Sequence, residues 1–238
     1  MLTSLDARPQ PAARACLALW LLSVLALWTA AHALNRWELG MDESSEARRF
    51  LFWTIAKVVA WLLPTFIMLR RVRGDAASAC WLGLTTAKGL GVAAAWSLLW
   101  ISLQEAGVRL QLPLFSRPPS ELTWSAALTA LLVAPLFEEL MFRGAMLRVL
   151  RSEGCTRGVS VTLAALAFAI LHVPGWVFRL GLVPALAGSF VPMCGFGMVA
   201  GALAWRTPSL WAPILLHFAN NFWSTGALAW AVDRASGP

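Results

Sequence analysis

A short charged cluster interrupts the apolar stretch of residues 122–147. Glu138, Glu139 and Arg143 are its only charged residues. An ionised side chain at membrane depth is unfavourable by about 3 kcal/mol or more, so such residues are rare unless they pair with one another or serve a function. A chain that keeps three of them together in an apolar helix is therefore predicted to have a functional site there.

The spacing of these three residues separates the two carboxylates. On a helix, Glu139 and Arg143 are four positions apart and lie on one face, where they can form an ion pair. Glu138 is rotated by about 100° from that face. The sequence thus predicts one glutamate held by the arginine and a second glutamate free for chemistry.

The composition is that of an integral membrane protein. Of the 238 residues, 59% are hydrophobic and 13% charged, and the mean hydropathy is +0.67. Soluble domains carry about 25% charged residues. The net charge of +7 does not indicate nucleic-acid binding, because the basic residues lie between apolar runs. The four cysteines have no paired spacing, which argues against a disulfide framework and a zinc knuckle.

The apolar runs predict an all-α bundle of about seven transmembrane helices. We expect these helices at residues 15–34, 50–69, 89–103, 122–147, 159–172, 184–205 and 209–232. The fifth should stop at His172, because Val173-Pro174-Gly175 follows it, and a separate helix over 175–190 would make eight. We divide this single integral membrane domain into N-terminal helices over 1–121 and a catalytic core over 122–232.

Two polar features of the first two runs have alternative interpretations. Ala31-His32-Ala33 resembles a signal-peptide cleavage site, but we favour a retained first helix because the chain goes on to cross the membrane repeatedly. We interpret His32 as an interfacial residue without chemistry. We interpret Lys57 as a structural residue that snorkels or pairs with a carboxylate.

The distribution of basic residues predicts the orientation. With a cytoplasmic N terminus, the cytoplasmic segments carry the densest basic groups, which are Arg8 and Arg14, then Arg70, Arg71, Arg73 and Lys88, then Arg148, Arg151 and Arg157, then Arg206. This bias fits the positive-inside rule. We expect a protein of a bacterial inner membrane with its N terminus inside, and with the lipid bilayer as its surroundings.

Further polar groups in the C-terminal half occur in pairs four residues apart. Phe168 and His172 form one pair, and His217 and Asn221 form another, so each pair faces one direction from its helix. Each histidine or asparagine alone would be read as an interfacial residue or as a hydrogen bond between helices. Together with Glu138 they supply a carboxylate, two imidazoles and a carboxamide, which can activate water and stabilise an oxyanion.

These motifs resemble those of the CAAX-prenyl endopeptidase type II and bacterial Abi (CPBP) family of glutamic-type intramembrane proteases. The likeness rests on Glu138-Glu139-x-x-x-Arg143, Phe168-x-x-x-His172, His217-x-x-x-Asn221 and the stretch 197–217, and it covers about residues 122–225. It implies an intramembrane protease without a serine or cysteine nucleophile, acting on a membrane-anchored or tail-bearing protein at a C-terminal tail or sorting segment.

The resemblance also implies roles for individual residues. Glu138 would be the general base, His172 would assist the water, and His217 with Asn221 would form the oxyanion hole. Glu139, Arg143 and Phe168 would support the site. No cofactor is expected.

Other functions remain open from the residues alone. Glu138, His172 and His217 could hold zinc with a fourth position for water, although no H-E-x-x-H is present. A non-catalytic immunity or scaffold protein of the same fold is a second alternative. A transporter with a proton relay is a third, but the sequence has no inverted repeat.

Overall fold

The computed structural model describes residues 11–40, 44–73, 87–112, 122–184, 190–207 and 209–227. Within these ranges the chain is 90% helical and has no strand, as the all-α prediction requires. The elements are α1 (Pro11–Leu34), η1 (Asn35–Leu39), α2 (Glu46–Lys57), η3 (Val58–Leu62), α3 (Leu63–Arg73), α4 (Ala87–Arg109), α5 (Trp124–Leu128), η4 (Thr129–Val133), α6 (Ala134–Glu139), η5 (Leu140–Met146), α7 (Leu147–Ser152), α8 (Arg157–Leu180), α9 (Leu182–Pro184), α10 (Val191–Arg206) and α11 (Trp211–Ser224).

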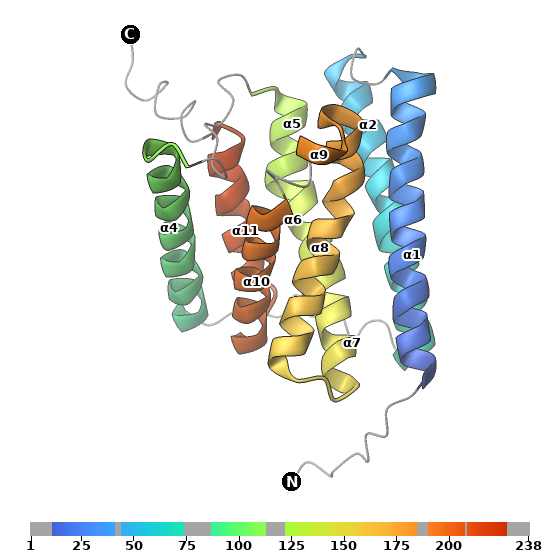
Figure 1. Cartoon of the computed structure of the whole chain (residues 1–238), viewed down its shortest axis with the longest axis vertical. Coiled ribbons are helices and arrows are strands. Elements are labelled where there is room, and N and C mark those ends of the chain that lie inside the picture. The colour runs from blue at the N-terminus through green and yellow to red at the C-terminus, as the bar shows by residue number, and fades with distance from the viewer. Residues whose placement is uncertain are drawn as a thin grey trace.

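Several of these elements join into long rods, which stand side by side (Figure 1). The rod α2–η3–α3 and the rod α5–η4–α6–η5–α7 are each continuous, with π-helical turns inside them. In Figure 1, α1 and α4 lie at opposite edges of the bundle and α8 lies between them. The element η5 carries Arg143, so the charged cluster sits within a rod that α8 and α10 contact.

Four helices of the described part are long and apolar enough to cross a membrane. They are Ala13–Trp37, Glu46–Val72, Trp124–Ser152 and Arg157–Arg179. The chain is thus an integral membrane protein by its apolar helices. The expectation of seven or eight spans stays a prediction, and part of the seventh, beyond residue 227, lies outside the described residues.

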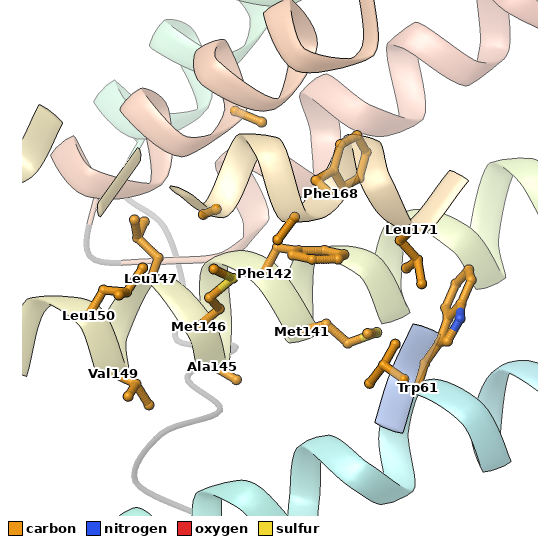
Figure 2. Close-up of a cluster of buried hydrophobic side chains, with 14 of the residues drawn as sticks. Trp61, Met141, Phe142, Ala145, Met146, Leu147, Val149, Leu150, Phe168 and Leu171 are labelled. Carbon is orange, nitrogen blue, oxygen red and sulfur yellow. The ribbon is translucent and has the colours of Figure 1, made fainter. Parts of the chain in front are cut away.

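The core lies where α8 meets the rods on either side of it. Phe142 of η5 and Phe168 of α8 pack edge to face, with ring centroids 5.4 Å apart (Figure 2). On another side of α8, Gly197 of α10 lets the two backbones approach. A Cβ at Gly197 would lie 2.9 Å from the Cα of Ala165, closer than ordinary contact allows. This glycine therefore sets the spacing between α8 and α10.

The first two rods pack through residues at four-residue spacing. Trp20, Val24, Trp28 and His32 of α1 are all buried, and they form one ridge along the helix. The indole Nε1 of Trp20 donates to the Thr65 hydroxyl at 2.9 Å. The interface is thus largely aromatic with a few buried polar groups.

The expected helix end at His172 is wrong, because α8 continues through Pro174 to Leu180. A proline inside a helix loses one backbone hydrogen bond and kinks or breaks the helix unless its surroundings hold it. Here Pro174 and Gly175 are buried. A Cβ at Gly175 would lie 3.1 Å from the His32 ring, so α1 packs closely against α8 just after the proline.

His32 is not at an interface with solvent or lipid, contrary to our expectation. It is only 6% exposed. Its ring lies 4.7 Å from each of the rings of Trp28 and Trp53 and stacks on Phe178. His32 is therefore a packed residue of the α1 ridge.

Candidate active site

The ion pair predicted between Glu139 and Arg143 is present and fully buried. Arg143 Nη1 donates to Glu139 Oε1 at 2.9 Å, and both side chains have 0% exposure. The second guanidinium nitrogen, Nη2, donates to the Gly197 carbonyl at 3.1 Å. The guanidinium carbon also lies 4.7 Å from the centre of the Phe168 ring. Arg143 therefore connects three helical elements and neutralises Glu139.

Glu139 in turn holds His217. The Nδ1 atom of His217, on α11, lies 2.8 Å from Glu139 Oε1. Because a carboxylate oxygen accepts hydrogen bonds, Nδ1 is the donor in this bond. The phenyl ring of Phe196 packs against the same imidazole at 5.0 Å. The ring is thereby fixed with Nε2 directed away from Glu139.

The free glutamate predicted from the sequence, Glu138, faces both histidines. Its Oε2 lies 3.6 Å from His172 Nε2 and 3.7 Å from His217 Nε2. This oxygen is buried and has no hydrogen-bond partner within the described ranges. Glu138, His172 and His217 come from three different helical rods, so the fold brings together groups that are far apart in the sequence.

His172 is oriented by its own helix. Its Nδ1 lies 2.8 Å from the Phe168 carbonyl oxygen, which can only accept, so Nδ1 carries the hydrogen. In a neutral ring the lone pair is then on Nε2, the atom that faces Glu138. The imidazole also stacks on Trp176, with centroids 5.5 Å apart. His172 and His217 therefore share one arrangement, with Nδ1 committed and Nε2 presented to the carboxylate.

The sequence of residues 120–223 matches the family model described as type II CAAX prenyl endopeptidase Rce1-like. This part of the chain belongs to the Rce1-like family. The match confirms the family resemblance that the motifs indicated. The matched residues include Glu138, His172, His217 and Asn221. No curated protein and no solved structure matches the chain. The family is one of proteases, so the match points to a membrane peptidase of the CAAX protease type.

Asn221 of the Rce1-like segment is held by its own contacts. Its Nδ2 donates to the Ala130 carbonyl at 2.7 Å, and its Oδ1 accepts from Asn220 Nδ2 at 2.9 Å. The Oδ1 of Asn220 accepts a bond from Trp100 Nε1 at 2.8 Å. Asn221 thus bonds to η4 directly and is linked to Trp100 of α4 through Asn220. None of its described contacts is with Glu138, His172 or His217.

A cavity of about 440 Å³ opens beside the carboxylate of Glu138. The Rce1-like segment supplies most of its wall, including Glu138, His172 and Trp176, and the first two rods supply the remainder. Those residues are Trp28, His32, Arg49, Phe50, Trp53, Lys57 and Trp61. The N-terminal helices therefore build part of the site, a role that we did not predict from their sequence.

A sequence signal for this wall exists. Trp53, Lys57 and Trp61 recur at four-residue spacing, which places them on one face of a helix. Lys57 forms no ion pair with the residues that the structure describes, and it is buried rather than extended to an exposed surface. It is 7% exposed, and its Nζ lies 5.0 Å and 4.8 Å from the ring centres of Trp28 and Trp61.

Among the residues that the structure describes, no group of three or more His, Cys, Asp or Glu side chains has an arrangement that could hold a metal ion. Glu138, His172 and His217 lie close together, with Glu138 Oε2 3.6 Å and 3.7 Å from the two Nε2 atoms. Their chemistry alone would suit zinc.

Proposed function

We propose that this protein is an intramembrane endopeptidase that uses Glu138 to activate water against a peptide bond of a membrane-associated substrate. The observation that supports this most is the environment of Glu138 Oε2. The oxygen is buried without a hydrogen-bond partner, two imidazole nitrogens face it at 3.6 Å and 3.7 Å, and it borders a cavity. A carboxylate kept free in this way suits a general base.

In the proposed reaction, Glu138 takes a proton from water while the water oxygen attacks the carbonyl carbon of the substrate. His172 orients the water through Nε2, because its Nδ1 is already committed to the Phe168 carbonyl. The proton held by Glu138 then passes to the amine nitrogen as the C–N bond breaks. The products are a carboxylate and an amine, as in any hydrolysis.

The negative charge on the carbonyl oxygen needs donors. His217 would donate from Nε2 when its ring carries both hydrogens, and Glu139 holds that ring through Nδ1 at 2.8 Å. Asn221 is the second proposed donor. One of its two amide hydrogens is used by Ala130 O, and the other is available for an oxyanion.

Glu139, Arg143 and Phe168 support these groups without acting on the substrate. Arg143 neutralises Glu139 at 2.9 Å and is itself packed on Phe168. A misplaced imidazole lowers catalysis even when all reacting groups are present. We therefore assign these three residues a positioning role.

We propose catalysis without a metal or another cofactor. If zinc took part, Glu138, His172 and His217 would hold it, and zinc would lower the pKa of a bound water. The proposal predicts that purified active protein keeps its activity after treatment with a chelator. Loss of activity with chelator and recovery with zinc would contradict it.

The proposed substrate is a membrane-anchored or tail-bearing protein that is cut at a C-terminal tail or sorting segment. This follows from the family and from a site that lies among apolar helices. We place the protein in a bacterial inner membrane with its N terminus in the cytoplasm, on the basis of the basic segments. No nucleic acid is involved.

The test compares the membrane and surface proteomes of a host that carries wild type or Glu138→Gln. The amide keeps the shape of the side chain and removes the base. We expect a defined set of proteins to keep their C-terminal or membrane segments only in the Glu138→Gln strain. Glu105→Gln is a matched control, because Glu105 is an exposed carboxylate paired with Arg109. Matching proteomes, together with a phenotype on gene deletion, would instead support a non-catalytic protein.

A further inference from the structure

Lys57 is a buried cation for which the membrane peptidase chemistry has no use. Its described contacts are the faces of two indole rings, at 5.0 Å for Trp28 and 4.8 Å for Trp61. No hydrogen bond or ion pair from Lys57 exists among the described residues. Its environment differs in this respect from that of the other buried charges in the bundle.

Two indole rings do not satisfy an ammonium group. The rings attract its charge, but the three N–H donors keep their need for oxygen acceptors. Burial of a charge without acceptors is unfavourable. Glu138 and Arg179 line the same cavity as Lys57. The ammonium is therefore held in place by the rings while its donors stay uncommitted.

The cavity itself is suited to an anion. Its lining carries three cationic side chains, Arg49, Lys57 and Arg179, against the single carboxylate of Glu138. That carboxylate already faces His172 and His217. The remaining wall includes four tryptophans and one phenylalanine, whose rings suit apolar side chains. An occupant with an apolar body and one negative group fits this lining best.

We propose that Lys57 binds a carboxylate of the substrate and so determines which peptides the site accepts. The inference rests on the proposed function of this site as a peptidase. Glu138 and Lys57 line one cavity of about 440 Å³, a volume within the range of small-ligand sites. A carboxylate at Lys57 would fix the distance from that group to the bond that Glu138 attacks. Lys57 is thus a specificity residue, and its carboxylate is either the free C terminus or an acidic side chain.

The experiment measures which peptides the full-length protein retains. Purified Glu138→Gln in detergent binds without cutting, and it is offered a library of short apolar peptides made both as free acids and as C-terminal amides. A third set consists of amides with one internal Glu. Retained peptides are quantified by mass spectrometry for Glu138→Gln, for Glu138→Gln with Lys57→Met, and for Glu138→Gln with Lys88→Met. Lys88 is an exposed lysine on α4 and serves as the matched control.

We expect Glu138→Gln to retain carboxylate-bearing peptides at least about tenfold better than plain amides. The preference should disappear with Lys57→Met and persist with Lys88→Met. A preference for free acids identifies the terminal carboxylate, and a preference for the Glu-containing amides identifies an acidic side chain.

Equal retention of acids and amides by Glu138→Gln would overturn the inference, whether or not the Lys57→Met protein folds. A preference that survives Lys57→Met in a folded protein would overturn it as well. Failure of the proposed function would look different, because wild type would then bind these peptides and leave them uncut.

Discussion

Two buried cations of this protein, Arg143 and Lys57, are held in opposite ways. Arg143 donates to the Glu139 carboxylate at 2.9 Å and to the Gly197 carbonyl at 3.1 Å, with a phenyl ring against its face. Lys57 has two indole rings beside it and a cavity in front of it. Both side chains are buried, yet among the described residues only Arg143 is paired with an opposite charge.

This difference indicates two roles: Arg143 holds the site together, and Lys57 is available to a ligand. The planar guanidinium of Arg143 offers several donors at fixed angles, which suits a permanent junction of helices. An ammonium on a flexible stem does not form such a junction and can donate to an arriving acceptor. The predictions below test this division, in order of decreasing effect on stability.

The largest effect is expected for Arg143→Met. It leaves the buried Glu139 without its cationic partner, and loss of one partner of a buried ion pair destabilises a protein by about 3–5 kcal/mol. Thermal unfolding in detergent should show a strongly lowered midpoint. Adding Glu139→Gln should restore part of the loss, because it removes the uncompensated charge. If Arg143→Met alone unfolds like wild type, the pair does not hold the helices together.

A smaller loss is expected for Gly197→Ala, which attacks the same junction sterically. The new Cβ would lie 2.9 Å from the Ala165 Cα, so α10 must shift and carry its carbonyl away from Arg143. Overpacking of this kind destabilises by about 1–3 kcal/mol. Gly91→Ala on α4 is the control. It has no neighbour within 4 Å of the added carbon and should be neutral or stabilising. Equal midpoints for Gly197→Ala and wild type would contradict the close approach.

The smallest effect on stability is expected for Lys57→Met. Replacing a lone buried charge by an apolar residue of similar length is often neutral or stabilising, and the indole rings of Trp28 and Trp61 can pack on the methionine. We expect a change of less than about 1 kcal/mol in unfolding free energy. A loss as large as that of Arg143→Met would mean that Lys57 is structural, and the comparison would fail.

The interactions that the sequence could predict were local or were recognisable as motifs. The ion pair of Glu139 and Arg143 follows from helical periodicity alone. The all-α membrane architecture follows from the apolar runs. The family follows from three motifs in order, and residues 120–223 confirm it.

The remaining features depend on packing between helices. The continuation of α8 past Pro174 depends on the approach of α1 to Gly175, which no local rule contains. The position of Asn221 against Ala130 depends on how α11 meets η4. Trp53, Lys57 and Trp61 of the cavity wall have a visible four-residue spacing. Spacing shows only that residues share a face, and it does not show which face another rod covers.

The central claim is that Glu138 is the general base, and it is tested most directly by the cleavage rate of purified Glu138→Gln on a substrate identified in the host. We predict a rate at least about a hundredfold below wild type, the lower end of the effect of a general base. The unfolding midpoint should not change, because Glu138 Oε2 has no hydrogen bond to lose. Cleavage by a folded Glu138→Gln protein at a rate close to that of wild type would contradict the claim.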